Sequence, residues 1–291
     1  MGFITGTDVE VTMEMIGKFQ EEEQNRKEKE ARERGEKPLK EKAGGHSAFM
    51  DFYAIGARMH MKEYGTTQRQ LAVIASKAHN NSTLNPLAQY TFPLTVEEVL
   101  ADREVAYPLT RSMCAPIGDG AAAAIICSES FLKKIGRRRA VRIRASVLQS
   151  GNRERENDIC SRSARLAYEM AGVGPDDIDV AEVHDATTFG ELYQTEQMGF
   201  CSLGEGGPFA ESGATSLGGK LPVNPSGGLI ARGHPVGASG LAQIHELVTH
   251  LRGEAGKRQV ENARIAFAEN GGGFLGQGEA AMAVHILEKI S

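Results

Sequence analysis

Two histidines lie in sequence contexts that could support catalysis. His184 occurs in VHDATT, residues 183 to 188, directly after the apolar run IDVAEV and before a segment with helical spacing. His234 lies in NPSGGLIARGHPVGASG, residues 224 to 240, where Pro235 pushes its backbone toward extended geometry. A histidine held rigidly near the start of a helix can polarise a carbonyl or a thiol. The two motifs therefore predict chemistry at a carbonyl carbon.

Each histidine also has a purely structural interpretation. Asp185 or Thr187 would cap the helix that follows, and His184 would then only pair with Asp185. The glycines around His234 would simply build tight turns. The residues alone leave both interpretations open.

A third loop, AENGGGFLGQG at residues 268 to 278, matches the spacing GxGxxG formally. A dinucleotide site is not expected, because the apolar run AAMAVHIL follows it instead of a helix. A glycine turn between adjacent strands is the ordinary explanation. Close approach of its backbone to a ligand is the functional one.

Strands and helices alternate from about residue 138 to the end, and these elements must position the three loops. Strands are expected at 141–150, 178–183, 264–269 and 280–288, and helices at 160–173, 186–200 and 237–253. This alternation predicts a layered α/β sheet. The front third is expected to be helical over 46–80 and 95–105, and an apolar strand at 121–127 precedes a short helix.

The composition excludes several classes of protein. With 41% hydrophobic and 24% charged residues the chain is globular, and its net charge of −5 gives no reason to expect nucleic-acid binding. No apolar run reaches the length of a membrane span. The four cysteines form no CxxC pair, so we expect a reducing, cytoplasmic location, and no metal site is expected.

Residues 18–42 are dense in alternating charges, with pairs such as Glu22 and Arg26 spaced i to i+4. This spacing predicts an exposed helix that ends at Gly35 and Pro38. A solvated surface helix or mobile insertion is the ordinary interpretation. Docking of a partner is the alternative.

In combination, these stretches resemble the thiolase superfamily, and most closely its sterol-carrier-protein-type thiolases. The resemblance is carried by YGTTQRQLAVIASKAHNNSTLNPLAQY, APIGDGAAAAIICSE, IDVAEVHDA, NPSGGLIARGHPVGASGLAQ and LRGEAGKRQV. Together these segments cover most of the chain from about residue 46.

The resemblance implies a five-layered αβαβα architecture built from two similar halves. The C-terminal half would be complete and the N-terminal half incomplete. Residues 1–117 would form a loop-domain-like helical region, 118–137 the last strand and helix of the N-terminal half, and 138–291 the C-terminal domain. It also implies acyl-CoA substrates, with coenzyme A as a substrate and no cofactor, and assembly into homo-oligomers or hetero-oligomers.

The resemblance also assigns roles to individual residues. His234 would line the active site, activate the nucleophilic cysteine and bind a thioester oxygen, and His184 would be the second donor to that oxygen. The residues expected to contact substrate are Gly233, Asn224, Ser226, Gly271 and Gly272.

Two departures from the family pattern stand out. The nucleophilic cysteine of the family lies in a segment that would precede Met1, and none of Cys114, Cys127, Cys160 and Cys201 takes its place. The family's acid–base Cys-x-Gly turn reads Glu269-Asn270-Gly271, and Ala186 replaces the cysteine that some relatives carry beside the first histidine. Glu269 could serve as the base if it is buried with a raised pKa, whereas Asn270 could only hydrogen bond.

Three functions follow as expectations. The first is thiolytic cleavage of 3-oxoacyl-CoA, or the reverse Claisen condensation, with a separate part supplying the nucleophile. The second is a retro-aldol lyase on a branched 3-hydroxyacyl-CoA, with a small partner protein and Tyr193 or another tyrosine as acid. The third is a non-catalytic subunit that binds acyl-CoA or acts as a scaffold.

Because a half-sheet would expose strand edges and apolar faces, we also expect the chain to associate or aggregate.

Overall fold

The computed structural model describes residues 21, 25–26, 29, 48–136, 139–151, 159–273 and 279–290. Most of the charged segment 18–42 therefore lies outside the described residues. Arg26 is described: its guanidinium pairs with the Glu104 carboxylate at 3.0 Å and lies 4.5 Å from the centre of the Tyr107 ring. No helix in the described part is long and apolar enough to cross a membrane.

The front of the chain forms the helices that the sequence predicted. They are α2 (Ala48–Tyr64), α3 (Gln68–Ser82) and α4 (Val96–Ala101). Thr67 and Thr95 begin α3 and α4 with complete capping boxes, in which each threonine and the third helical residue satisfy one another's backbone N–H groups. A small hairpin follows, made of β1 (Glu104–Ala106) and β2 (Leu109–Thr110), and then the short 3-10 helix η1 (Arg111–Met113).

This front region shares an apolar cluster with the C-terminal region. Its apolar cluster contains Leu71, Ile74 and Met113, and the same cluster includes Phe189 and Leu192 from a helix of the later part. The helices of the front third therefore pack on the C-terminal region.

A four-stranded mixed sheet forms the centre of the C-terminal region. Its strands are β3 (Val141–Ser150), β4 (Val180–Glu182), β5 (Ile265–Gly272) and β6 (Ala281–Lys289), in the order β3-β6-β5-β4. β4 and β5 run parallel, whereas β6 is antiparallel to both β5 and β3. Beyond β4, Val223 forms a parallel bridge with Ala181, so a further extended segment lies beside that strand.

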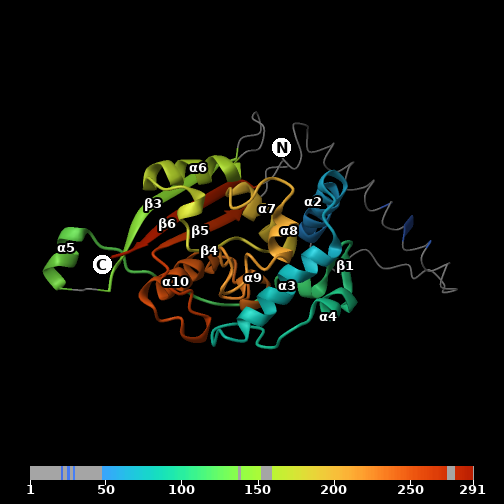
Figure 1. Cartoon of the computed structure of the whole chain (residues 1–291), viewed down its shortest axis with the longest axis horizontal. Helices are drawn as coiled ribbons and strands as arrows, with labels where there is room; N and C mark the ends of the chain where they lie inside the picture. The colour runs from blue at the N-terminus through green and yellow to red at the C-terminus, as the bar shows by residue number, and fades with distance from the viewer. Residues whose placement is uncertain are drawn as a thin grey trace.

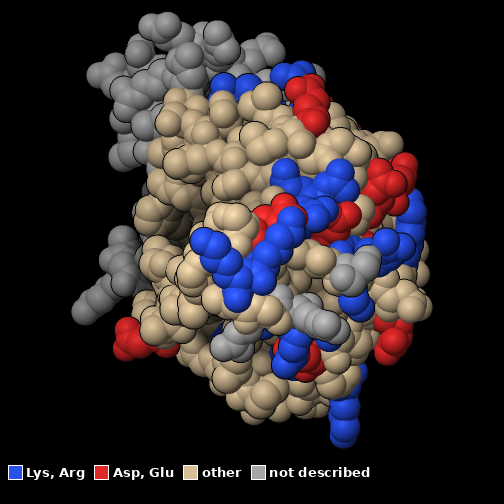
Figure 2. Space-filling view, turned by 90° about the vertical axis from the view of Figure 1, so that its left-hand side faces the viewer, with Lys and Arg blue, Asp and Glu red and all other residues tan. Residues whose placement is uncertain are grey.

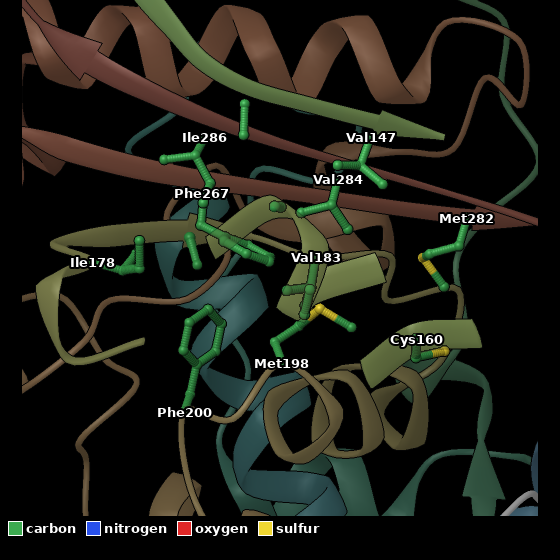
Figure 3. Close-up of a cluster of buried hydrophobic side chains, with 14 of the residues drawn as sticks. Val147, Cys160, Ile178, Val183, Met198, Phe200, Phe267, Met282, Val284 and Ile286 are labelled. Carbon is green, nitrogen blue, oxygen red and sulfur yellow. The ribbon is translucent and has the colours of Figure 1, made fainter. Parts of the chain in front are cut away.

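Helices cover both faces of this sheet, as the alternating pattern predicted (Figure 1). One face packs against α6 (Ile159–Ala171) and the chain that follows α7 (Thr188–Gln197). Figure 3 shows this cluster, in which Phe267 and Val284 of the sheet meet Met198 and Phe200. The other face packs against α10 (Ser239–Arg252) through Leu247. The predicted layered α/β fold is confirmed.

Several short elements have no clear sequence signal. They are η2 (Pro175–Asp177), α8 (Gly206–Glu211), α9 (Gly228–Arg232) and η3 (Gly256–Arg258). Of these, α9 matters most for the site, because it lies directly before the turn that carries His234.

The strand predicted at 121–127 is wrong for this structure. The segment carries no regular structure, and the side chains of Ile117 and Ile125 are each 99% exposed. The following helix α5 (Glu129–Ile135) forms as predicted but buries none of its residues, and it stands away from the body (Figure 1). Strand preference is realised only beside a pairing neighbour, and among the described residues no strand pairs with this segment.

Charges of both signs occupy the end of the molecule that carries α5 and the outer strand β3 (Figure 2). Arg142 and Arg144 both pair with Glu288, and Lys133 pairs with Glu129 within α5. These three basic side chains therefore have acidic partners.

The exposed apolar segment predicts self-association. Replacing both Ile125 and Ile126, which are 99% and 76% exposed, by lysine should reduce association, because it removes apolar surface and adds repulsive charge. Size-exclusion chromatography with light scattering should then give a smaller species than the parent. Ser130→Lys, which adds charge nearby but removes no apolar surface, is the matched control. A parent chain that is already monomeric at the same concentration would contradict the prediction.

Candidate active site

Three chain segments end at the same edge of the sheet, and this edge carries the candidate site. β4 and β5 are parallel with Glu182 beside Ala268, and Val223 runs parallel to β4. His184 comes two residues after β4, Glu269 is the next residue of β5, and Val223 leads into the turn that passes through α9 to His234. In open α/β sheets, ligands bind at the carboxyl ends of parallel strands.

The structure brings the two predicted histidines together. The centres of the His184 and His234 rings lie 5.1 Å apart, and the ring planes are nearly perpendicular, at 89°. Both residues are partly exposed. Two imidazoles in this arrangement form one surface on which a single polar atom can be bound. Their catalytic roles stay predictions.

Asp185 holds the two histidine loops in this relation. It follows His184 directly, and its carboxylate accepts a 2.6 Å hydrogen bond from the backbone N–H of Leu229, at the start of α9. Of the two caps considered for the next helix, Thr187 is the one used, since its hydroxyl accepts from Gly190 N–H. Gly228 has a φ of 61° and a Cβ there would collide with the Asp185 carboxylate, so only glycine fits.

The turn around His234 is fixed on several sides. Gly233 has a φ of 110°, and a Cβ there would lie 2.8 Å from the Gln89 side chain. Gln89 also donates to the carbonyl of Ile117, which forms a parallel bridge with His234. The backbone N–H of Gln89 bonds to the carbonyl of Arg232 at 2.9 Å. Gln89 of the front region therefore fixes the position of the turn that carries His234.

The Ser239 hydroxyl controls the tautomer of His234. Its oxygen lies 2.8 Å from His234 Nδ1 and 3.1 Å from the Pro235 carbonyl. The hydroxyl has one hydrogen. If that hydrogen goes to Pro235, Nδ1–H donates to Ser239 and Nε2 is an acceptor; if it goes to Nδ1, Nε2–H is a donor. The site can therefore present His234 as either a base or a donor.

Both imidazoles are kept neutral. Burial, and then the neighbouring His234 ring, lower the pKa of His184 to about 3, partly offset by the Asn270 side chain. The pKa of His234 is also lowered, first by burial and then by the charge of Arg232. Neutral imidazoles suit a site that must donate hydrogen bonds to a developing anion without carrying charge in the resting state.

Glu269 lies within the fold beside them and is fully buried. Its Oε2 accepts a 2.8 Å hydrogen bond from the backbone N–H of His184, while Oε1 has no hydrogen-bond partner. Burial raises its pKa to about 8, and the charge of Glu279 adds to this shift, whereas the backbone N–H groups of His184 and Gly271 oppose it. A carboxyl group with a pKa near neutral can act as acid or base.

The adjoining residues of the turn are positioned by α10. Asn270 donates to the Gln243 side chain at 3.0 Å, and Gln243 donates to the Glu269 carbonyl at 3.0 Å. Gly271 is buried under Glu279 and Met282, whereas a Cβ on Gly272 would meet nothing within 4 Å. Among the described residues, none covers Gly272 on this side.

Asn224 and Ser226, expected to contact substrate, are fully buried. Asn224 accepts from the Val183 N–H and donates to the Glu191 carboxylate, both at 2.9 Å. The Ser226 hydroxyl donates to Glu182 at 2.8 Å. In this structure both side chains position the turn, and their contact with substrate stays a prediction.

The sequence did not single out the buried charges of this network. The Lys77 ammonium forms a short contact with the Glu191 carboxylate and donates to the Val223 carbonyl at 2.8 Å. Burial raises the pKa of Glu182 to about 7, although the charge of Arg232 lowers it. Lys77 lies 114 residues before Glu191. No local pattern could have predicted this pair.

No thiol of the described chain belongs to the histidine pair. Cys114 bonds to the Thr110 carbonyl, and burial raises its pKa to about 12. Cys160 donates to Glu279 at 3.7 Å, and its pKa is raised well above the ordinary value by burial. Cys127 is exposed, and Cys201 has a pKa raised to about 12 by burial. The described residues also contain no group of three or more side chains suited to a metal ion.

Comparison with known proteins agrees with this architecture. Residues 146–289 match the family described as thiolase C-terminal domain-like. The chain is 45% identical over 248 residues to an acetyl-CoA acetyltransferase of Methanothermobacter thermautotrophicus, an alignment that covers 83% of this chain and 63% of that protein. It is 41% identical to the benzoylsuccinyl-CoA thiolase subunit BbsB of Thauera aromatica, over 76% of this chain and 59% of that one.

Two further proteins are similar to this chain. Human sterol carrier protein 2 is 42% identical over 77% of this chain and 43% of its own length. Among solved structures, the Ltp2-ChsH2(DUF35) aldolase superposes with a TM-score of 0.67 at 23% identity, over 82% of this chain and 63% of that one. At this identity the likeness concerns the fold alone. The chain spans less than two thirds of the length of each of these proteins.

The lowered pKa of His184 predicts acid sensitivity. Between the folded pKa of about 3 and the unfolded value near 6.5, only the unfolded state binds the proton. Stability should therefore fall as the pH drops through this window, by at most about 1.4 kcal/mol per pH unit for one group. Urea unfolding of His184→Gln should show a shallower loss between pH 7 and pH 4 than the parent. His245→Gln, an exposed position on α10, should retain the parental slope, and identical slopes for all three proteins would contradict the prediction.

Proposed function

Because the chain belongs to the thiolase superfamily through residues 146–289, we propose that it forms and stabilises the enolate of an acyl-CoA thioester. The observation that carries this proposal is the contact of two neutral imidazoles, 5.1 Å apart, beside the buried carboxyl group of Glu269. Coenzyme A is part of the substrate, and no cofactor is invoked.

Each group has a distinct task in this chemistry. The thioester oxygen accepts hydrogen bonds from His184 and from His234, which carries its hydrogen on Nε2 when the Ser239 hydroxyl donates to Nδ1. These donors are fixed in advance and stabilise the charge as it develops. Glu269 removes the proton from the carbon next to the thioester, or returns it in the reverse direction. Gly272 leaves space for the acyl chain or the pantetheine arm.

The reaction that best uses these groups is thiolase-type acyl transfer. A thiolate attacks the 3-oxo carbon, the C2–C3 bond breaks, and the electron pair moves onto the thioester as an enolate. Glu269 then protonates C2, and the enzyme-bound acyl group passes to coenzyme A. Since no described cysteine contacts either histidine, the nucleophile would come from outside the described residues, on a separate polypeptide or a further part of the protein.

The carboxyl group at position 269 favours a second candidate, retro-aldol cleavage of a 3-hydroxyacyl-CoA. The base removes the proton of the 3-hydroxyl group, the C2–C3 bond breaks to give a carbonyl product, and the enolate of the shortened acyl-CoA is protonated. This reaction needs the two imidazoles and a base but no nucleophilic thiol. A small partner protein would be expected with it. Tyr193, whose pKa burial raises, would remain a protonated donor near this site.

Enolate formation is tested by deuterium exchange at C2 of acetyl-CoA in heavy water, followed by mass spectrometry. We expect the full chain to catalyse this exchange. His184→Ala and His234→Ala should each lower the rate by about 10²- to 10³-fold, as for loss of one oxyanion donor. Glu269→Gln should lower it by about 10²- to 10⁴-fold. His245→Ala is the matched control. Binding of acetyl-CoA without exchange would overturn the enolate proposal and favour a non-catalytic acyl-CoA-binding subunit.

The two reactions are separated by their need for a nucleophile. Acyl transfer predicts that 3-oxoacyl-CoA is cleaved only with free coenzyme A and a supplied polypeptide corresponding to the remaining part of the relatives, and that a covalent acyl-enzyme is trapped there. Retro-aldol cleavage predicts release of a ketone or aldehyde from a branched 3-hydroxyacyl-CoA without free coenzyme A. Cleavage of 3-oxoacyl-CoA by this chain alone would contradict the proposed external source of the nucleophile.

A further inference from the structure

A second carboxyl group lies next to Glu269, across a glycine. Glu279 precedes β6, and its Cγ would lie 3.1 Å from a Cβ built on Gly271. The same Cβ would lie 3.4 Å from Oε1 of Glu269. The two side chains therefore converge over Gly271, and they can do so only because this position has no side chain.

The hydrogen bonds of Glu279 give it the character of a carboxylate. Its Oε1 accepts from the Gln194 side chain at 3.4 Å, and its Oε2 accepts from the Cys160 thiol at 3.7 Å. Both oxygens are thus acceptors, which is the pattern of an ionised group.

Glu269 differs from Glu279 in its bonding. Its Oε2 accepts the His184 N–H at 2.8 Å, whereas its Oε1 has no geometrically sound hydrogen-bond partner, and the nearby Gly271 N–H only lowers the pKa of the carboxyl group. Full burial penalises a negative charge on a carboxyl group whose Oε1 has no such donor, and so favours the protonated form. Oε1 is therefore the position for a proton.

None of the described groups that shift the pKa of Glu269 is a cation. The titratable groups that contact the pair or respond to its charge are Tyr53 of α2, Cys160 of α6, His184 after β4, and Tyr193 of α7. All are acids or a neutral imidazole. Burial raises the pKa of both Glu269 and Glu279, and two such carboxyl groups side by side do not both ionise readily.

We infer that Glu279 is a positioning residue that keeps a proton on Oε1 of Glu269, by holding a fixed carboxylate across Gly271. The inference rests on the proposed role of Glu269 as the acid–base group. Two carboxyl groups whose charges act on one another titrate as a coupled pair. Glu269 can then give a proton to a substrate carbon or take one from it near neutral pH, whereas an isolated, solvated glutamate would be almost fully ionised.

The test observes the proton on Glu269 directly and does not depend on turnover. Carboxyl carbons of the full chain are labelled with ¹³C-glutamate, and the Glu269 signal is identified by its loss in Glu269→Gln. Its midpoint should lie above neutral pH in the parent. In Glu279→Gln, removal of the neighbouring carboxylate should lower the midpoint by about one pH unit or more. Glu261→Gln, at an exposed position, should leave it unchanged.

A second variant perturbs the pair while retaining both carboxyl groups. Gly271→Ala places a methyl group 3.0 to 3.1 Å from Met282 and Glu279, so these two side chains must shift by a few tenths of an ångström. Displacement of Glu279 from Glu269 should lower the Glu269 midpoint, in the same direction as Glu279→Gln. If the Glu269 midpoint moves by no more than a few tenths of a pH unit in both variants, the inference is overturned.

Deuterium exchange measured on the same proteins separates this inference from the proposed function. Because Glu269 must be ionised to remove the C2 proton, the acidic limb of the pH–rate profile should shift to lower pH together with the Glu269 midpoint. Glu269 signals that move as expected, in a parent protein without exchange, would support the carboxyl pair and overturn the enolate proposal. Exchange in the parent, together with a Glu269 midpoint that does not move in either variant, would support the enolate proposal and overturn the carboxyl pair.

Discussion

The hydrogen bond from the Leu229 N–H to the Asp185 carboxylate is the contact on which the site depends. His184 directly precedes Asp185, and His234 follows the short helix that Leu229 helps to begin. One 2.6 Å bond therefore sets the distance between two loops that are separated by some fifty residues of chain. A five-residue helix is too short to be stable by itself, so its position must come from such tertiary contacts. Gly228 is constrained for the same reason, because a side chain there would occupy the space of the carboxylate.

Buried charged side chains order the turn that precedes His234. Lys77, Glu191 and Asn224 form one buried network, and Glu182 with Ser226 forms another. Such groups stabilise little overall, since desolvation offsets most of their attraction, but loss of one partner is costly, at about 3–5 kcal/mol. Because Lys77 belongs to α3 and Asn224 to the turn, the network makes the front helices part of the site's support.

The sequence predicted what depends on local signals or on strand order. The helices over 46–80 and 95–105 and the strand at 141–150 were predicted from neighbours in the chain, and the shared site of His184 and His234 was predicted from the family resemblance. The failures have a common physical cause. Residues 121–127 have strand preference but no strand neighbour in the described chain, and the pairing of Lys77 with Glu191 depends on tertiary contact across 114 residues.

Neutral imidazoles and a protonated carboxyl group at one site are consequences of the same burial. A poorly hydrated environment penalises every charged form, so it lowers the pKa of His184 and raises that of Glu269. In the proposed reaction, neutral imidazoles and a protonated Glu269 face the thioester, and the negative charge of Glu279 lies across Gly271 from Glu269. If the proposed enolate forms, its charge arises in a region of low dielectric constant, where fixed N–H groups act most strongly on it. A carboxyl group can replace a thiol in such a site because burial brings the pKa of Glu269 close to that of an ordinary cysteine.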